Sequence, residues 1–376
     1  MTPEENNASH LKLGLKPSKA PLIGVMRLSA LGDVTNALAA VSSIRAHFKE
    51  SRIVWFVGKI EHQLLKDIEG LEFEVINKKN PFKEFSRLKK KYKNTEFDIL
   101  LHMQRSLRCS LMVKALKSKK TIGFDATRAR ELQWLFTSEQ ISEPKSPHAV
   151  DVFMEFAFKA GVPNDQRPVW NFGAFNSTSE VQSALNLKDL NLGEKESYLA
   201  IVACGSQKDR AWSASNNAEI IDWVLEHTKY KVCLLGGPSD FEKKHALEII
   251  EHSQLKTEDR LINLVGRTDL KMLKSIIKHA KALVSPDTGP VHISSALGTP
   301  TVGLYVHMPK EITGPYNHLS LAVDKYKEAL KLYYNKDAPE TYLGIPKRIK
   351  DKPEAINLIS SSEVVDKLKK ALKEDL

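Results

Sequence analysis

Residues 285–305, SPDTGPVHISSALGTPTVGLY, contain a turn that could bind an anion. They follow an apolar segment that is typical of a buried strand. Thr288 can cap a helix, Pro290 fits the first helical turn, and Gly298 can end the helix. In a parallel sheet such a turn lies at the carboxyl edge, where the free N–H groups of the helix favour a phosphate. An ordinary strand-to-helix connection would use the same capping residues, so the spacing alone leaves both interpretations open.

A carboxylate follows a glycine in a second turn, VMRLSALGDVTN at residues 25–36. Gly32 allows close approach of the backbone, and Asp33 falls at or just inside the start of a predicted helix. A carboxylate at such a turn could accept a proton from a hydroxyl nucleophile. It could equally cap the helix and take no part in chemistry.

Cations are prominent in a third turn, ACGSQKDRAWS at residues 203–213. Gly205 and Ser206 suit passage close to phosphate oxygens, and Lys208 and Arg210 could donate to them. Trp212 is predicted to pack in the core.

Two further glycine turns follow predicted strands, at residues 234–242 and 264–268. Asp240 or Glu242 in the first could reach a ribose hydroxyl, and Gly266 in the second allows another close approach of the backbone.

Several familiar motifs are absent from the sequence. It has no glycine-rich dinucleotide fingerprint, no Walker lysine loop, no nucleophile elbow and no Asp-x-Asp pair that would hold a metal against a diphosphate. Charge on a departing phosphate would therefore be stabilised by helix N-termini, backbone amides and basic side chains.

These turns belong to two series of alternating strands and helices, which predict an α/β protein with doubly wound parallel sheets. The first series has strands predicted at 22–28, 52–57, 71–76 and 97–102, with helices at 34–48, 61–67, 82–93 and 106–116. The second has strands predicted at 198–203, 231–235, 261–264, 282–285 and 301–305.

The expected organisation is two facing Rossmann-like domains with the active site in a cleft between them. The predicted segments are a polar leader at 1–20, to which no function is assigned, an N-terminal domain at 21–170, a C-terminal domain at 171–350 and a C-terminal helical segment at 351–376.

Composition limits the class of protein. The chain has 376 residues and a formal charge of +10, and residues 1–170 carry nearly all of the excess. A basic segment with helical spacing, residues 78–93, could lie on an anionic membrane or present a solvated basic face. No apolar run is long enough to span a membrane or to form a signal peptide, and Cys109, Cys204 and Cys233 lack metal or redox spacing. A cytoplasmic protein with buried free thiols is expected.

The pairing of RLSALGDV (27–34) with DTGPVHISSALGTPT (287–301) resembles glycosyltransferase family nine, the ADP-heptose:lipopolysaccharide heptosyltransferases. The segments HMQRSLR (102–108) and CGSQKDRAW (204–212) are also similar to this family. The resemblance extends from about Leu22 to the terminal helix.

The resemblance implies a GT-B enzyme whose second domain binds the nucleotide sugar and whose first domain binds the acceptor. It implies inverting transfer of heptose from ADP-heptose to an inner-core sugar on lipid A, without a metal or other cofactor. Asp33 would be the general base, and Arg210, which stands where the family often has Lys, would stabilise the departing ADP. The other expected donor-binding residues are Gly205, Ser206, Lys208, Asp240, Gly266, Asp287, Thr288, Gly289 and His292.

A basic first domain suits an acidic acceptor at the inner surface of the cytoplasmic membrane. The expected acceptor-binding residues are Gly32, Gln104, Arg105 and Arg108. Peripheral contact with that membrane is expected, and no nucleic-acid partner. Another nucleotide-sugar glycosyltransferase, an epimerase of similar fold and a non-catalytic nucleotide-sugar-binding protein remain alternatives.

Overall fold

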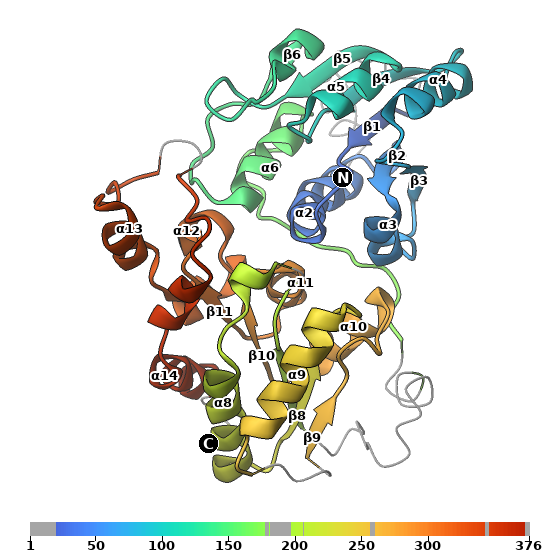
Figure 1. Cartoon of the computed structure of the whole chain (residues 1–376). Coiled ribbons are helices and arrows are strands. Elements are labelled where there is room, and N and C mark those ends of the chain that lie inside the picture. The colour runs from blue at the N-terminus through green and yellow to red at the C-terminus, as the bar shows by residue number, and fades with distance from the viewer. Residues whose placement is uncertain are drawn as a thin grey trace. The chain divides into compact units, whose positions relative to one another are not determined.

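The computed structural model describes residues 20–176, 180, 197–205, 207–255, 260–342 and 346–372. The chain divides into two compact units (Figure 1). Unit 1 comprises the described residues up to Ala174, and unit 2 those from Phe175 onward.

Unit 1 is built on a six-stranded parallel sheet with the strand order β3-β2-β1-β4-β5-β6. The first strand lies in the middle, where Gly24 pairs with Val54 on one side and Leu100 on the other. A Cβ atom on Gly24 would come within 2.6 Å of the Leu100 side chain, so glycine fits this crowded position. The strands are β1 (Leu22–Met26), β2 (Arg52–Gly58), β3 (Leu71–Ile76), β4 (Glu96–Leu101), β5 (Lys117–Gly123) and β6 (Glu139–Gln140).

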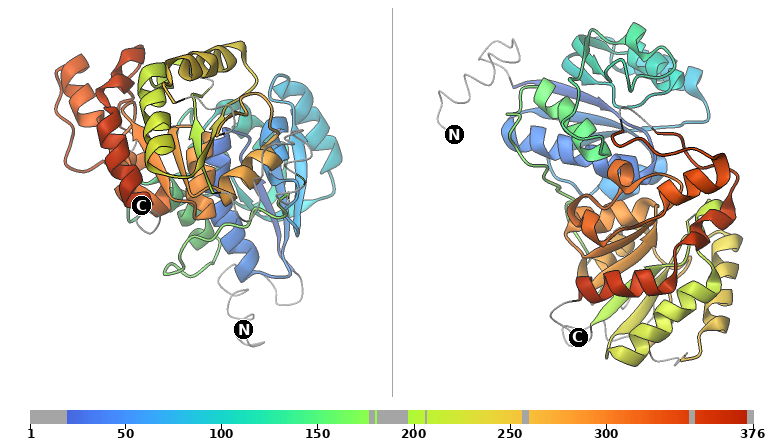
Figure 2. Two further views of the ribbon diagram at one scale, coloured as in Figure 1. Left: turned by 90° about the horizontal axis from the view of Figure 1, so that it is seen from below. Right: turned by 90° about the vertical axis from the view of Figure 1, so that its left-hand side faces the viewer.

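Helices cover both faces of this sheet. Helix α2 (Leu31–His47) packs against α6 (Ala149–Lys159), and Figure 2 shows the two side by side in blue and green. The residues of α2 from Val34 to Ile44 are all buried. The other elements are α3 (Lys59–Leu65), α4 (Pro81–Lys91), α5 (Leu107–Lys114) and the short 3-10 helix η1 (Gln133–Phe136).

Unit 2 repeats the arrangement with the strand order β12-β11-β10-β7-β8-β9. Its strands are β7 (Tyr198–Val202), β8 (Lys231–Leu235), β9 (Leu261–Asn263), β10 (Ala282–Pro286), β11 (Thr301–Tyr305) and β12 (Val323–Asp324). Both sheets are parallel, which confirms the doubly wound α/β fold of the GT-B class. Each sheet therefore presents its strand-to-helix turns at a carboxyl edge.

The helices of unit 2 include α8, which packs against α9 and α14, and α10, which packs against α11. The C-terminal helix, which the sequence could not assign to a unit, contributes Val364 and Leu368 to the core of unit 2. The helical segments are η2 (Lys208–Arg210), α8 (Ala214–His227), α9 (Asp240–His252), α10 (Leu270–His279), α11 (Gly289–Leu297), α12 (Lys310–Thr313), η3 (Tyr316–Leu321), α13 (Tyr326–Tyr334), η4 (Pro353–Leu358) and α14 (Ser361–Ala371).

Some expectations about individual residues can be checked directly. Cys109, Cys204 and Cys233 are buried free thiols, as predicted. Trp212 is a packing residue, also as predicted, with 1% of its surface exposed and its indole N–H donated to Ile359 O at 3.0 Å. Within the described part of the chain, no helix is long and apolar enough to cross a membrane.

Candidate active site

The turns after β7 and β10 of unit 2 lie against each other. The two strands are neighbours in the sheet, with Ile201 paired to Val284, so their carboxyl ends meet. A Cβ atom on Gly205 would come within 2.5 Å of Thr288 Cγ2, which explains why this position is a glycine. Thr288 occupies the N-cap position of α11, as predicted, but its hydroxyl donates to Pro286 O at 3.2 Å and does not cap the helix; Gly289 begins the helix. The first N–H groups of α11 consequently open beside the Gly205 turn.

A cation from the β7 turn is held against this helix start. Arg210 donates a hydrogen bond to Asp287 O, and its Nη1 lies 3.6 Å from Asp287 Oδ2. His292 Nε2, one turn into α11, lies 3.7 Å from Asp287 Oδ1. Burial alone would raise the pKa of Asp287, but the hydrogen bond from His292 and the charge of Arg210 outweigh it and hold the pKa below its ordinary value. The carboxylate thus fixes Arg210 beside the free amides of α11.

Arg348 is a second guanidinium in this region that the sequence analysis did not identify. Its Nη2 donates to Gln207 Oε1 at 2.9 Å and lies 3.9 Å from Asp209 Oδ2. Burial and then the charge of Arg210 lower the pKa of Arg348, whereas the charge of Asp287 acts in the opposite direction. Spacing could not reveal this residue, because it lies 138 positions after Arg210 and is placed by the pairing of Ile349 N with His307 O at 3.0 Å.

The remaining donor candidates lie at neighbouring turns of unit 2. Gly266 has a φ of +74° and its N–H donates to Gly236 O at 3.1 Å, so the turns after β8 and β9 touch. Asp240 is exposed at the first residue of α9, and Lys208 Nζ lies 5.4 Å from the ring centre of Phe241. Ser206 lies outside the described residues. The structure therefore brings Gly205, Arg210, Asp287, Thr288 and His292 together, with Lys208, Asp240 and Gly266 further along the edge.

In unit 1, Asp33 lies in the first turn of α2, three residues after the N-cap position, which Ala30 occupies. Asp33 is therefore not the N-cap residue itself, but it does help to cap the helix, as the alternative interpretation expected, because its side chain accepts from the N-cap backbone as the N3 residue of a capping box. Asp33 Oδ2 accepts a hydrogen bond from Ala30 N at 3.3 Å and forms an ion pair with Arg27 Nη2. Both contacts use the same oxygen, and the side chain remains 46% exposed. Oδ1 is thus available to a ligand.

The buried side chain of Arg27 holds the Asp33 carboxylate in place, a role that the sequence did not suggest. Its side chain is 5% exposed, its Nη1 donates to Met103 O at 2.6 Å, and its Cζ lies 5.2 Å from the centre of the Phe153 ring. Its Nε is buried without a hydrogen-bond partner among the described residues. A buried guanidinium has few alternative positions, so it fixes the orientation of Asp33.

The other acceptor candidates line the same edge of unit 1. Gly32 immediately precedes Asp33 in α2, and Gln104 Oε1 accepts from Leu28 N at 3.1 Å, which joins the turns after β1 and β4. Arg105 Cζ lies 5.3 Å from the centre of the Phe124 ring. Burial, and then the charge of Arg27, lower the pKa of Arg105 to about 10, so it stays protonated at neutral pH. Arg108 is exposed in the first turn of α5.

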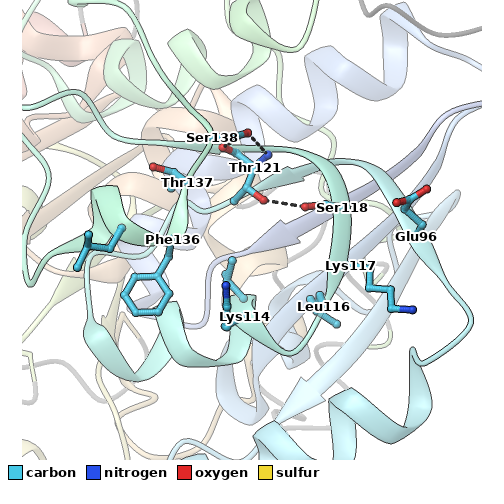
Figure 3. A pocket seen from close by; sticks show the side chains of 11 residues that line it. Glu96, Lys114, Leu116, Lys117, Ser118, Thr121, Phe136, Thr137 and Ser138 are labelled. Atoms are coloured by element: carbon cyan, nitrogen blue, oxygen red, sulfur yellow. Dashed lines mark hydrogen bonds between the residues drawn. The ribbon is translucent and has the colours of Figure 1, made fainter.

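A separate cavity of about 490 Å³ lies near the start of β5 (Figure 3). Its walls include Phe136 and Lys114, and Thr121 is hydrogen-bonded to Ser118 and Ser138. None of the predicted site residues lines it. In the described ranges, no group of three or more His, Cys, Asp or Glu side chains is arranged to hold a metal ion.

The described structure thus combines two parallel α/β units, with clustered cations at the carboxyl edge of one sheet and an oriented carboxylate at that of the other. The model of glycosyltransferase family 9 (heptosyltransferase) matches residues 85–340. The chain is 34% identical over 316 residues to the lipopolysaccharide core heptosyltransferase OpsX of Haemophilus influenzae, covering 84% of this chain and 88% of that relative. The chain belongs to glycosyltransferase family 9, the heptosyltransferases.

Solved structures agree with this assignment at the level of the fold. The family 9 glycosyltransferase from Veillonella parvula has a TM-score of 0.72 and 18% identity, covering 94% of this chain and 97% of that one. The ADP-heptose lps heptosyltransferase II of Escherichia coli has a TM-score of 0.68 and 19% identity, covering 94% of this chain and 98% of that one.

Proposed function

We propose that this heptosyltransferase transfers heptose from ADP-heptose to an inner-core sugar of lipopolysaccharide, with inversion at the anomeric carbon. The observation that carries the proposal is the contact between Arg210 and Asp287 at the N-terminus of α11. This arrangement suits a diphosphate, because the N–H groups at the start of α11 and the guanidinium of Arg210 lie at the same turn and could bind the same phosphate oxygens. The names of the similar proteins, a lipopolysaccharide core heptosyltransferase and an ADP-heptose heptosyltransferase, support the choice of sugar and nucleotide.

The donor is proposed to bind unit 2. The amides of Thr288 and Gly289 would hold the diphosphate, and Gly205 and Ser206 would pass close to it. Arg210 and Arg348 would neutralise the charge that develops as ADP departs. Asp287 and His292 would position Arg210 and the helix start. Asp240 lies at the exposed start of α9, where it could accept a hydrogen bond from a ribose hydroxyl.

The acceptor is proposed to bind unit 1, which supplies the base. Asp33 Oδ1 would take the proton of the acceptor hydroxyl as its oxygen bonds to the anomeric carbon of heptose. The bond from that carbon to the diphosphate breaks on the opposite face, and ADP leaves with the electron pair. Gly32, Gln104, Arg105 and Arg108 would orient an acceptor that carries phosphate or carboxylate groups.

Metal-independent transfer is part of the proposal, because two guanidinium groups and the α11 amides can supply the positive field that a metal would otherwise provide. Transfer should therefore continue at an unchanged rate in excess EDTA. Inactivation by EDTA, with recovery on adding a divalent cation, would contradict this part.

Donor choice can be tested by titrating the full chain with ADP-heptose, ADP-glucose and UDP-N-acetylglucosamine in a calorimeter. ADP-heptose is expected to bind most tightly. Preference for a uridine nucleotide would favour another glycosyltransferase reaction. Conversion of the donor sugar without any acceptor would favour an epimerase.

A further inference from the structure

Four large apolar side chains are exposed together on unit 1, and we call this region the α5–η1 surface. Leu107 begins α5, and Leu132, Trp134 and Leu135 lie at or beside η1, which packs on α5. Their exposed fractions range from 43% to 57%. The two segments are joined at the surface by a hydrogen bond of 2.7 Å from Leu107 N to Glu131 Oε2. A group of exposed apolar side chains on a protein surface often marks a binding site.

The backbone of the α5–η1 surface is unusual where the apolar side chains begin. Glu131 and Leu132 have φ angles of 49° and 59°, in the left-handed region that favours glycine. A leucine in this conformation costs free energy, and with 56% of its surface exposed Leu132 gains less from burial than a core leucine would. The turn therefore presents an apolar residue to the surroundings at the expense of local stability.

Positive charge surrounds this apolar cluster. Arg108 and Arg130 are exposed next to Leu107 and Glu131, and Arg130 is close enough to contribute to the lowered pKa of Arg105. Of the nearby carboxylates, Glu131 is hydrogen-bonded to Leu107, and Asp125 is paired with Arg128 at 3.1 Å. The neutral backbone donor leaves the Glu131 carboxylate in place, so two exposed arginines against this one carboxylate give the edge of the surface a small net positive charge.

The cavity near the start of β5 continues this surface. Leu135 lines it together with the apolar side chains of Val113, Leu116 and Phe136. Two lysines, Lys114 and Lys117, and one carboxylate, Glu96, line the same cavity (Figure 3). Apolar walls beside lysines match the chemistry of a lipid, which joins an apolar chain to an anionic headgroup.

We infer that the α5–η1 surface docks on a bilayer of anionic lipid, with Trp134 and the leucines at the headgroup boundary. Tryptophan favours this boundary, and each nearby cation adds attraction to anionic lipid. Because the surface adjoins Arg105 and Arg108, docking would hold unit 1 next to a lipid-linked acceptor; this benefit rests on the proposed function, whereas the docking itself does not.

The test is co-sedimentation of the full chain with vesicles of phosphatidylcholine, or of equal parts phosphatidylcholine and phosphatidylglycerol. The wild-type protein is expected to bind the anionic vesicles only, with a blue shift of Trp134 emission that Trp134→Phe removes. Leu132→Ser combined with Trp134→Ser should lower the partition coefficient about tenfold or more. Arg130→Gln should lower it less, and only on anionic vesicles.

Matched controls lie on unit 2, where Leu247 and Leu332 are 56% and 63% exposed. Leu247→Ser combined with Leu332→Ser should leave vesicle binding unchanged. The proposal is overturned if the wild-type chain does not bind anionic vesicles, binds neutral ones equally, or loses binding equally in both double variants. Transfer to a deacylated, water-soluble acceptor should be normal in the Leu132 and Trp134 variant. Failure of transfer by the wild-type protein despite vesicle binding would reject the proposed function and leave the docking surface standing.

Discussion

At the scale of single residues, Arg27 and Asp33 form a unit in which the buried member orients the exposed one. The guanidinium of Arg27 is held by Met103 O and by its stacking on Phe153, so the carboxylate it binds has a defined direction. Asp33 presents its other oxygen to solvent. A base in a transferase needs this combination of fixed geometry and access.

Asp33→Asn should lower turnover about a hundredfold or more, because an amide cannot accept the proton. Donor affinity should be unchanged, since Asp33 belongs to the other unit from the proposed diphosphate site. The melting temperature should fall modestly, because the buried Arg27 loses its ion pair. Steady-state kinetics, donor titration and thermal unfolding measure the three quantities.

Glu363→Gln provides the control for Asp33→Asn. Glu363 occupies the same position in α14, three residues after the N-cap Ser360, and its Oε2 accepts from Ser360 N at 3.1 Å. This substitution should lower stability while turnover stays normal. If Asp33→Asn behaves like Glu363→Gln and keeps its turnover, Asp33 is a structural residue and has no part in the mechanism.

A second prediction at this scale concerns Arg348. Arg348→Gln should weaken ADP binding by about tenfold to a hundredfold, because a hydrogen bond to a charged phosphate contributes about 1.5–3 kcal/mol. Lys347→Gln removes the same charge one residue away, where Nζ lies 3.7 Å from the centre of the Tyr334 ring, and should leave ADP binding unchanged. Equal effects of the two substitutions would indicate that only the general charge of the segment matters. Calorimetric titration with ADP distinguishes these results.

At the scale of elements, the strand-to-helix turns at the carboxyl edges carry the proposed chemistry, while buried ion pairs attach the surrounding helices. Helix α4 illustrates the second role. Glu74 of β3 is bound by Arg87 and Lys91 of α4 and accepts from Tyr92 OH at 2.9 Å. The basic helix is thus tied to the sheet by one carboxylate whose side chain is 6% exposed.

Glu74→Gln should lower the free energy of unfolding by about 1–2 kcal/mol at neutral pH. Burial alone would raise the pKa of Glu74, but the hydrogen bonds from Lys91, Arg87 and Tyr92 outweigh it, so the pKa in the folded protein is lowered. Its contribution is therefore complete above the ordinary pKa of a glutamate and is lost as the pH falls through the lowered value. Denaturant unfolding of both proteins at several pH values should show the difference shrinking in acid.

Glu72→Gln on the same strand is the matched control, because Glu72 is 51% exposed in its pair with Arg52. Its effect should stay within about 0.5 kcal/mol. A Glu74→Gln protein as stable as the Glu72→Gln protein would show that the Glu74 cluster does not stabilise α4.

Sequence periodicity predicted most of the strands that carry apolar patterns, but it missed the apolar helix α6 and several elements without such a pattern. Strands β2 and β3 were predicted to within a residue, because each presents apolar residues bounded by turn signals. Strand β5 was not predicted, because the first five of its seven residues, KSKKT, are polar, and β6 is only two residues long. The strand predicted at 22–28 ends two residues earlier in the structure, at Met26. The next residue, Arg27, already contributes its side chain to the site.

At the scale of the whole molecule, the two units divide the proposed chemistry between them. The turn motifs of the sequence directed attention to Asp33, Arg210 and the α11 start, because glycine, proline and capping residues have strong local signatures. Arg27 and Arg348 were not assigned roles, because their contacts depend on strand pairing and on residues far away in the sequence. The exposure of apolar residues such as Trp134 was not predicted either, since periodicity does not show which apolar side chains remain accessible to solvent.

The most direct measurement for the proposed transfer is release of ADP from ADP-heptose by the full chain, with and without an inner-core lipopolysaccharide acceptor. ADP should appear only when the acceptor is present, and mass spectrometry should show that each acceptor molecule gains one heptose. The new bond should have the anomeric configuration opposite to that of the donor. ADP release without heptose on the acceptor, or no release with any inner-core acceptor, would contradict the proposed reaction.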